Sequence, residues 1–404
     1  MKASGKRYLR FCGIDVGKDH HVAAVVHPEG HFLVRSQSFP HSRPGFTRLL
    51  DTLRRLGRPS DILVGLEATG PYWYSLHEFL TAHGYALVVL NPIQTAREGK
   101  KAIRKCKTDK RDARSIAVLI KNGTRPPTLI PDDLAMTCRQ LSRTRYALTQ
   151  KITRVKLQLW ARLHPVWPEY EPIFADPFGA TGRALLGRYP TPADLRQADP
   201  AELTALIRSA SRGKYGPNRL ETIRRAAEAS IGVTKGLEGF RTTIRSGLDE
   251  LAVLRNLRDA LDEQIRPYVD RLPTYLLTLP GISPPRAVSL YGELHPVTNF
   301  KTPERVVAFA GFDTTVFQTG NYLAPHRAIS KRGSPYLRRT LWLMAARAVQ
   351  SEGDLRTFYL RKRKQGLHHL AAVTATALRL CHVIWRILTD ERDYRPQGRP
   401  ETTS

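Results

Sequence analysis

Four carboxylates in the first part of the sequence have residue types and spacings suited to binding divalent metal ions. Asp15 ends an apolar run rich in strand-forming residues, and Glu67 ends a second such run. Asp109 and Asp112 are three residues apart, which places both side chains on one face of a helix. Carboxylate oxygens are hard ligands that suit Mg²⁺ or Mn²⁺. We expect the four acids to converge on a two-metal site for phosphodiester chemistry, with the ions about 4 Å apart.

Parts of this pattern have other interpretations. Asp109 and Asp112 could simply complement the helix dipole, because carboxylates favour helix N-termini. The run Asp15-Val16-Gly17 also opens actin-like and sugar-kinase-like ATPases, in which a glycine-rich turn holds phosphates. The ATPase interpretation is disfavoured, because we find no second glycine-rich phosphate loop and because a nucleotide site would not explain the charge of the chain.

The elements that must position these acids form an α/β pattern. Hydrophobic periodicity and turn residues predict an antiparallel meander of two or three strands, followed by alternating helices and strands. In chain order the sequence predicts the meander over residues 8–39, a helix at 45–56, a strand ending at Glu67, a helix near 72–82, a strand at 85–92, and a helix that Thr108 caps. This is the ribonuclease H-like order, with an antiparallel start and βαβ units after it.

The charge of the chain indicates a polyanionic partner. The 404 residues include 64 Lys and Arg against 36 Asp and Glu, which gives a net charge of +28 and a pI near 10.4. A uniformly basic composition is the alternative, but residues 97–114 alone contain nine Lys or Arg. Because basic side chains that neutralise phosphates release counterions, we expect a nucleic-acid partner, contacted by Lys105, Lys107 and Arg111 among others.

The middle of the sequence is predicted to be helical. Residues 134–164 form a basic helical pattern, residues 173–230 form a compact helical insert, and helix returns over residues 218–272. A stripe of apolar residues at steps of three and four predicts a packing seam, either in cis with the 134–164 helix or in trans with another subunit. The stripe consists of Leu248, Leu251, Leu254, Leu257, Leu261 and Ile265.

The C-terminal third contains a second group of candidate functional residues. Residues 275–294 form two helical halves around Gly281, a pattern typical of a helix-hairpin-helix, whose turn amides can bind phosphate; an ordinary αα-hairpin is the alternative. Residues 305–349 then combine a hydroxyl-rich loop with basic side chains that we expect to bind nucleic acid. These are Lys331, Arg332, Arg338 and Arg339.

Cysteine usage and hydropathy indicate a cytoplasmic protein. Cys12, Cys106, Cys138 and Cys381 form no C-x-x-C pair, so the sequence predicts neither a zinc ribbon nor a disulfide framework. The N-terminus lacks the apolar region of a signal peptide, and we expect no run of about 18 or more apolar residues to span a bilayer.

Several motifs, taken in order, resemble a known family. GIDVGK, GLEATGPY, KTDKRDA, LPGI, and FAGF followed by QTGN and ISKRGSPYLRR are similar to insertion-sequence transposases with an N-terminal RuvC-like DEDD domain and a C-terminal transposase domain. The guide-RNA-directed bridge recombinases belong to that group. The resemblance extends from about Tyr8 to the neighbourhood of Trp385.

The resemblance implies a mechanism and a set of partners. Asp15, Glu67, Asp109 and Asp112 match the DEDD metal ligands. The family's nucleophilic serine corresponds here to Thr319, whose additional β-methyl group restricts χ1. Three alternatives follow, in order of preference: Thr319 acts as the nucleophile, Ser330 replaces it, or this copy is impaired. Implied partners are two Mg²⁺ ions (or Mn²⁺), donor and target DNA, a guide RNA, and a homodimer or tetramer in which the site forms between domains.

These observations lead to one expected domain organisation and three functions. We expect a RuvC-like domain over residues 1–130, a helical connector with an insert over 131–272, an α-helical C-terminal transposase domain over 273–390, and a disordered tail over 391–404. The leading function is magnesium-dependent DNA cleavage and rejoining by a transposase. The alternatives are a RuvC-type junction nuclease that uses metal-activated water, and a non-catalytic nucleic-acid-binding protein.

Overall fold

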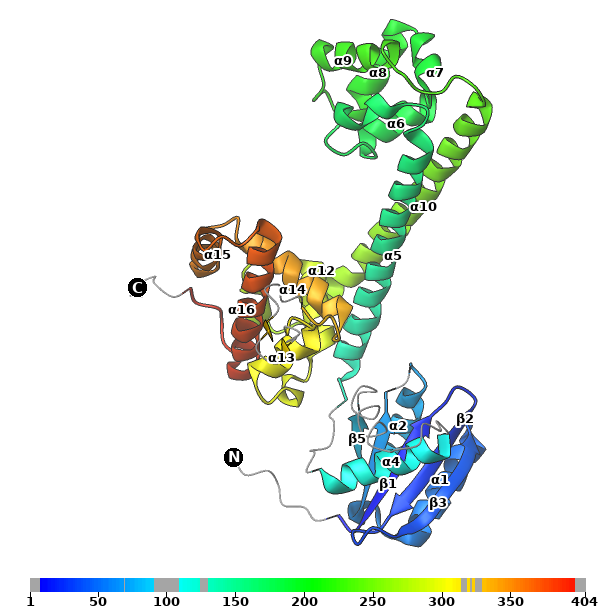
Figure 1. The fold of residues 1–404 in the computed structure, drawn as a ribbon, viewed down its shortest axis with the longest axis vertical. Coiled ribbons are helices and arrows are strands. Elements are labelled where there is room, and N and C mark those ends of the chain that lie inside the picture. The colour runs from blue at the N-terminus through cyan, green and yellow to red at the C-terminus, as the bar shows by residue number, and fades with distance from the viewer. Residues whose placement is uncertain are drawn as a thin grey trace. The chain divides into compact units, whose positions relative to one another are not determined.

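The protein forms two compact units, residues 1–130 and 131–404 (Figure 1). The structure is a computed structural model that describes residues 8–68, 70–90, 109–123, 130–313, 318–319, 322–323 and 329–396. The first unit contains a sheet with helices on it, and the second is almost entirely helical.

The sheet of the first unit has the predicted ribonuclease H-like order. Its five strands lie in the order β3-β2-β1-β4-β5. β1 pairs antiparallel with β2, β2 pairs antiparallel with β3, and β1, β4 and β5 are parallel neighbours. The strands are β1 (Arg10–Val16), β2 (His20–Val26), β3 (Phe32–Pro40), β4 (Ile62–Glu67) and β5 (Ala86–Leu90). The antiparallel meander and the later βαβ units are therefore both confirmed.

Two helices cover one face of this sheet. α1 (Arg43–Leu56) begins after Ser42, whose hydroxyl accepts a hydrogen bond from the Gly45 amide at 3.3 Å. α2 (Trp73–Ala82) follows β4, which the short 3₁₀ helix η1 (Pro59–Asp61) precedes. The core on this face combines the apolar stripe of α1 with alternate residues of the strands. This core fixes the register of the central strands, because a shift by one residue would turn the strand residues that face it to the opposite face of the sheet.

A single described helix, α4 (Asp109–Asn122), packs on the opposite face. Two strand glycines allow it to approach closely. A Cβ at Gly13 would lie 2.2 Å from the Ala117 nitrogen and 2.3 Å from the Ala113 oxygen, and a Cβ at Gly65 would lie 2.9 Å from Ile120 Cγ2. The helix backbone therefore lies directly on β1, closer than any side chain would allow.

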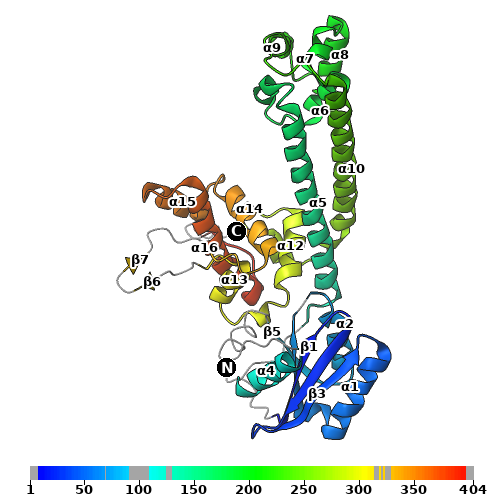
Figure 2. The same ribbon diagram turned by 45° about the vertical axis from the view of Figure 1, so that its right-hand side comes forward.

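The second unit is built on two long helices that run in opposite directions. α5 (Asp133–Leu163) and α10 (Leu237–Val269) lie side by side in both views (Figures 1 and 2). The apolar stripe of α10 packs against α5 of the same chain, so the in-cis alternative is the one observed in this structure. Leu257 is the exception, because 52% of its surface is exposed.

A helical insert connects the C-terminal end of α5 with the N-terminal end of α10. It has its own apolar core and contains η2 (Pro168–Ile173), α6 (Ala180–Arg188), α7 (Pro192–Arg196), α8 (Pro200–Ala210) and α9 (Pro217–Glu228). The expected helix over 218–272 is wrong in one respect, because it is interrupted between α9 and α10. A Cβ at Gly232 would lie 1.8 Å from the Val166 oxygen, and the Val233 amide donates to the Pro165 oxygen. The chain must therefore leave the helix to cross this turn.

The remaining helices form a second core around the N-terminal end of α5 and the C-terminal end of α10. They are α11 (Thr274–Leu277), α12 (Pro284–Leu294), α13 (Pro303–Ala310), α14 (Pro335–Ala348), α15 (Asp354–Lys364) and α16 (His369–Asp390), together with η3 (Val297–Asn299) and the two-residue strands β6 (Gln318–Thr319) and β7 (Tyr322–Leu323). The core includes residues before and after position 272. The predicted division into domains at 272/273 therefore stays a prediction.

Two expectations about the C-terminal part need correction. By length and composition α16 could cross a membrane, which the sequence argument did not anticipate. Its apolar face, including Leu380 and Ile384, is nevertheless buried in the core of the second unit, which accounts for its hydrophobicity. Tyr394 was expected in a disordered tail, but its backbone amide donates a hydrogen bond to Thr278 Oγ1 at 2.9 Å and its hydroxyl donates to Asp354.

A buried carboxylate joins three helices of the second unit. Glu293 on α12 is only 2% exposed, and Arg143 on α5 donates to both of its oxygens, at 2.7 and 3.2 Å. Ser334, the N-cap of α14, also donates to Glu293 at 2.9 Å. Because a buried charge is costly unless it is paired, this group makes the arrangement of the three helices specific.

Replacing Gly13 with alanine tests the close approach of α4 to the sheet. The added methyl would meet helix backbone, which cannot rotate away, so we expect Gly13→Ala to lower the free energy of unfolding by about 3 kcal/mol. Gly187→Ala is the matched control, because a Cβ there meets nothing within 4 Å and alanine favours helix. Denaturant unfolding followed by circular dichroism measures both. Equal stability of the two variants would contradict the packing described.

Replacing Glu293 with glutamine tests the buried ion pair. Glutamine keeps the shape but removes the charge that balances Arg143, so we expect the free energy of unfolding to fall by about 3 kcal/mol. Glu263→Gln is the control, because its ion pair with Arg266 at 2.8 Å is exposed. Thermal and denaturant melts compare the two, and a larger loss in the control would count against a structural role for Glu293.

Candidate metal site and nucleic-acid surface

Asp15 and Glu67 lie on neighbouring parallel strands of the first unit. The pairing of β1 with β4 aligns Ile14 with Leu66, so the two acids are the next residues along each strand. Side chains alternate between the faces of a sheet, and Gly13 and Gly65 both face α4. Asp15 and Glu67, two residues further on, therefore project from that same face. Both are half-buried.

Asp112 comes to this face from α4. It immediately precedes Ala113, which is buried against Val22, the residue that pairs with Asp15. Asp112 is also one helical turn before Ile116, which packs over Gly65. The fold thus brings three of the four predicted acids to one side of the sheet. Asp109 begins α4, but its side chain lies outside the described residues.

The donor chemistry of these residues fits a divalent ion, although the tightest cluster of potential ligands lies elsewhere. Carboxylate oxygens are the ligands that Mg²⁺ prefers. Within the described ranges, the group whose ligand atoms all lie within 4.8 Å of one another is His27, Glu29 and His31, at the turn between β2 and β3. The ligand atoms of Asp15, Glu67 and Asp112 do not form such a compact group. Metal binding by the four acids therefore stays a prediction.

The basic segment before α4 is only partly described. Lys105 and Lys107 lie outside the described residues, whereas Arg111 lies half-buried in the first turn of α4. Arg114, one turn later, donates to the Arg35 oxygen at 2.8 Å and lies over the Phe32 ring. Arg114 therefore fixes α4 to β3. Of the three nucleic-acid-binding residues predicted in this segment, Arg111 is the one that lies within the described residues.

In the second unit, two motifs that are distant in sequence lie side by side. The segment from Phe309 to Asp313 is hydrogen bonded to the segment from Ser330 to Ser334, through the Lys331 amide to the Gly311 oxygen at 3.1 Å and the Ser334 amide to the Phe309 oxygen at 2.6 Å. A Cβ at Gly333 would lie 2.0 Å from the Phe309 oxygen. Glycine is thus required there for the two segments to meet.

The predicted nucleic-acid-binding cations of this unit have different environments. Lys331 and Arg332 are exposed at the turn. Arg338 donates to the Ala310 oxygen at 3.0 Å, so it caps the C-terminal end of α13. Arg339 lies 5.5 Å from the centre of the Tyr146 ring on α5. Arg338 therefore has a structural role in addition to the predicted one.

The two candidate nucleophiles can be placed to different extents. Thr319 ends β6 and pairs with Tyr322 of β7, but its side chain lies outside the described residues. Ser330 donates a hydrogen bond from its hydroxyl to Asp313 and accepts one from the Arg332 amide at 3.3 Å. A hydroxyl beside a carboxylate could be activated by it, so the structure leaves Ser330 as an alternative to Thr319.

Gly281 has a clear packing role. Its φ is +72°, and a Cβ would lie 2.0 Å from the Met344 oxygen on α14. The first predicted helical half is only the four-residue α11, and Pro284 and Pro285 at the start of α12 have no N–H to donate. The Ile282 amide is bonded to the Leu279 oxygen. The helix-hairpin-helix and its phosphate-binding amides therefore stay predictions.

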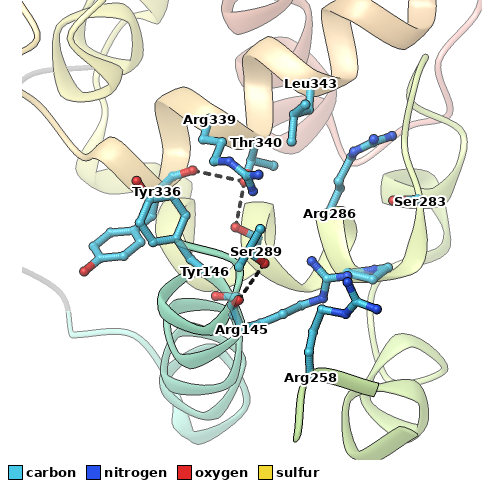
Figure 3. Close-up of a pocket in the computed structure, with 13 residues that line it drawn as sticks. Arg145, Tyr146, Arg258, Ser283, Arg286, Ser289, Tyr336, Arg339, Thr340 and Leu343 are labelled. Atoms are coloured by element: carbon cyan, nitrogen blue, oxygen red, sulfur yellow. Dashed lines mark hydrogen bonds between the residues drawn. The ribbon is translucent and has the colours of Figure 1, made fainter. Parts of the chain in front are cut away.

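Sequence reasoning missed a group of arginines that line one pocket of the second unit. Arg145 on α5, Arg258 on α10, and Arg286 on α12 join Arg339 there (Figure 3). Arg145 belongs to the basic helical pattern predicted over residues 134–164. The basic residues of separate helices give no signal of convergence in sequence, because the contact depends on the packing of α5, α10, α12 and α14.

Comparison with known families gives two matches in chain order. A transposase family model, the DEDD transposase of the IS110 type, matches residues 12–168, and a model of the transposase IS116/IS110/IS902 family matches residues 274–360. The first match includes all four predicted metal ligands. The second includes the joined segments from Phe309 to Ser334.

The full-length relatives are insertion-element proteins. The chain is 28% identical to a protein of insertion element IS116 from Streptomyces clavuligerus, over 95% of this chain and 96% of the relative. It is 24% identical to a protein of IS900 from Mycobacterium paratuberculosis, over 96% and 97% of the two chains. A likeness to Thermus thermophilus RuvC in complex with a Holliday junction substrate covers 30% of this chain and all of that chain, with 16% identity and a TM-score of 0.22.

The strand order, rather than that last likeness, establishes the fold of the first unit. The two family matches share one family and follow one another in the chain, and the relatives align along nearly its whole length. Together they identify the chain as a transposase of the IS110/IS116 family.

Proposed function

We propose that this transposase cleaves and rejoins DNA strands with divalent metal ions held by Asp15, Glu67, Asp109 and Asp112. The observation that supports this most is the shared face of Asp15, Glu67 and Asp112 in the first unit, brought about by β1, β4 and α4. Bound Mg²⁺ or Mn²⁺ ions would activate the attacking group and stabilise the leaving oxygen.

In this proposal the hydroxyl of Thr319 is the nucleophile. Its oxygen forms a bond to a backbone phosphorus while the bond from phosphorus to one strand oxygen breaks. The proton of the hydroxyl ends on the leaving oxygen, so a free strand end and a protein-linked end result. A hydroxyl end of the partner strand then attacks the same phosphorus and restores Thr319. One phosphodiester replaces another, so the exchange needs no external energy source.

The proposed partners are donor and target DNA, a structured guide RNA encoded beside the gene, and further copies of this chain. The net charge of +28 supports a nucleic-acid partner but does not distinguish RNA from DNA. The guide RNA and the dimer or tetramer rest on the resemblance to bridge recombinases. We place the protein in the cytoplasm.

The metal-site proposal predicts that Asp15→Asn abolishes strand exchange. The change preserves size but removes a charged ligand, so we expect the yield to fall by more than roughly 100-fold, beyond the effect typical of outer-shell residues. Recombinant product is measured with protein, the flanking noncoding RNA, paired DNAs and Mg²⁺. Asp19→Asn, an exposed acid at the nearby turn, is the control. An unchanged yield in Asp15→Asn would end the metal-site proposal.

The nucleophile proposal predicts a protein–DNA adduct that depends on residue 319. We expect denaturing gels to trap the adduct with the unmodified chain and with Thr319→Ser, and to show none with Thr319→Ala, because only the alanine lacks a hydroxyl. An adduct that persists in Thr319→Ala and disappears in Ser330→Ala would move the nucleophile to Ser330. Cleavage with no protein-linked ends would favour a junction nuclease that uses metal-activated water.

A further inference from the structure

A small polar pocket lies among four helices of the second unit. α5, α10, α12 and α14 surround it (Figure 3). Its volume is about 220 Å³. Pockets for small-molecule ligands and cofactors are usually larger, roughly 300–1,000 Å³. This pocket therefore suits a compact group such as phosphate better than a whole cofactor.

Two of the four arginines that line the pocket have their charge balanced. Arg145 makes a bidentate ion pair with Asp262, with Nη2 at 3.0 Å from Oδ2. Arg258 pairs with Asp259 at 2.6 Å. These pairs leave little net charge from the first two guanidinium groups.

The other two arginines have no carboxylate partner within the described part of the chain. Arg286 donates one hydrogen bond to the Gly281 oxygen at 2.9 Å, and Arg339 stacks on the Tyr146 ring. A carbonyl and an aromatic ring orient a guanidinium group but do not neutralise it. The pocket therefore carries two positive charges without counter-charges from the described residues.

The electrostatic cost of this arrangement affects both groups. Burial lowers the pKa of Arg286, and the positive charges of Arg145, Arg347 and Arg339 lower it further. Burial also lowers the pKa of Arg339, with Arg145 adding to the effect while Tyr146 opposes it. An anion in the pocket would relieve this repulsion, because it supplies the charge that the protein lacks.

The surrounding contacts hold the pocket in shape. Tyr146 packs edge-to-face on Tyr336 with ring centres 5.0 Å apart, which fixes the platform under Arg339. The Thr340 hydroxyl donates to the Tyr336 oxygen at 3.0 Å and is bonded to the Ser289 hydroxyl at 2.8 Å. Since both hydroxyls are engaged within the protein, the guanidinium N–H groups are the main donors available to a ligand.

We propose that this pocket binds a phosphate group of a nucleic-acid backbone. Among the described residues no Asp or Glu lines the pocket, so no carboxylate there would repel a phosphate, and a contact with the backbone phosphate positions a strand without reading its sequence. That the phosphate belongs to a nucleic acid rests on the proposed function, because free inorganic phosphate would make the same contacts with the pocket. Arg286 is thereby assigned to substrate binding in addition to Arg339, whereas Arg145 and Arg258 line the pocket with their charges paired.

The test compares two charge-matched double variants of the full chain. Arg286→Gln/Arg339→Gln removes the unpaired pocket charges, and Arg208→Gln/Arg224→Gln removes two exposed charges of α8 and α9. Binding of a labelled DNA duplex is followed by fluorescence anisotropy across a salt series without divalent ions. We expect the pocket variant to bind about tenfold more weakly, with a salt dependence shallower by roughly 1 to 2 units of slope, and the control to change little.

Stability separates loss of a ligand site from loss of the fold. Because the two arginines repel each other and Arg145, the pocket variant should melt at no lower temperature than the unmodified chain in phosphate-free buffer. Inorganic phosphate should raise the melting temperature of the unmodified chain and not that of the variant. Arg286→Lys/Arg339→Lys, which keeps the charges, should recover part of the DNA affinity.

Three results would overturn the inference. Equal weakening in both double variants would show general electrostatic attraction without a pocket. Loss of phosphate stabilisation with unchanged DNA affinity would assign the pocket to free phosphate. Unchanged behaviour in both assays would leave no anion site. Since binding is measured without metal ions, failure of the strand-exchange tests would not affect these outcomes, so the two proposals can fail separately.

Discussion

The close approach of α4 to the sheet is the constraint on which the first unit depends. Gly13 and Gly65 have no side chains, so the helix backbone rests on β1 and its isoleucines fill the space over β4. The same contact brings Asp112 to the face from which Asp15 and Glu67 project. A helix held further away by larger residues would cover the sheet equally well but would move Asp112 away from the strand acids. Packing and the proposed chemistry thus share one cause.

The arginines of the second unit differ in the groups that they contact. Arg143 neutralises the buried Glu293, and Arg338 caps α13 through the Ala310 oxygen, so both stabilise the fold. Arg286 and Arg339 are also partly buried, but among the described residues their partners are a carbonyl and an aromatic ring. A protein has no structural reason to gather unbalanced charges in a pocket, because doing so costs free energy. We infer that such residues are kept for a ligand, whereas paired ones are kept for the fold.

Much of the first unit could be predicted from sequence, because its signals are local. Alternating and continuous apolar runs indicate the strands, the stripe of Phe46, Leu49, Leu50 and Leu53 indicates α1, and turn residues set the antiparallel start. The strand order then follows from general rules of connection. What could not be predicted depends on contacts between distant segments. The helix breaks before α10 because Gly232 crosses closely over Val166. Tyr394 is held in place by its hydrogen bonds to Thr278 and Asp354.

The candidate site shows the same limit. Residue type and spacing led to the prediction of Asp15, Glu67, Asp109 and Asp112, whereas the convergence of Arg145, Arg286 and Arg339 depends on helix packing and gives no signal in sequence. Crystals soaked in Mn²⁺ would test the central claim most directly, because the ion is visible by anomalous scattering. The account predicts density bound by Asp15, Glu67, Asp109 and Asp112. Mn²⁺ found only at His27, Glu29 and His31, with none at the four acids, would contradict it.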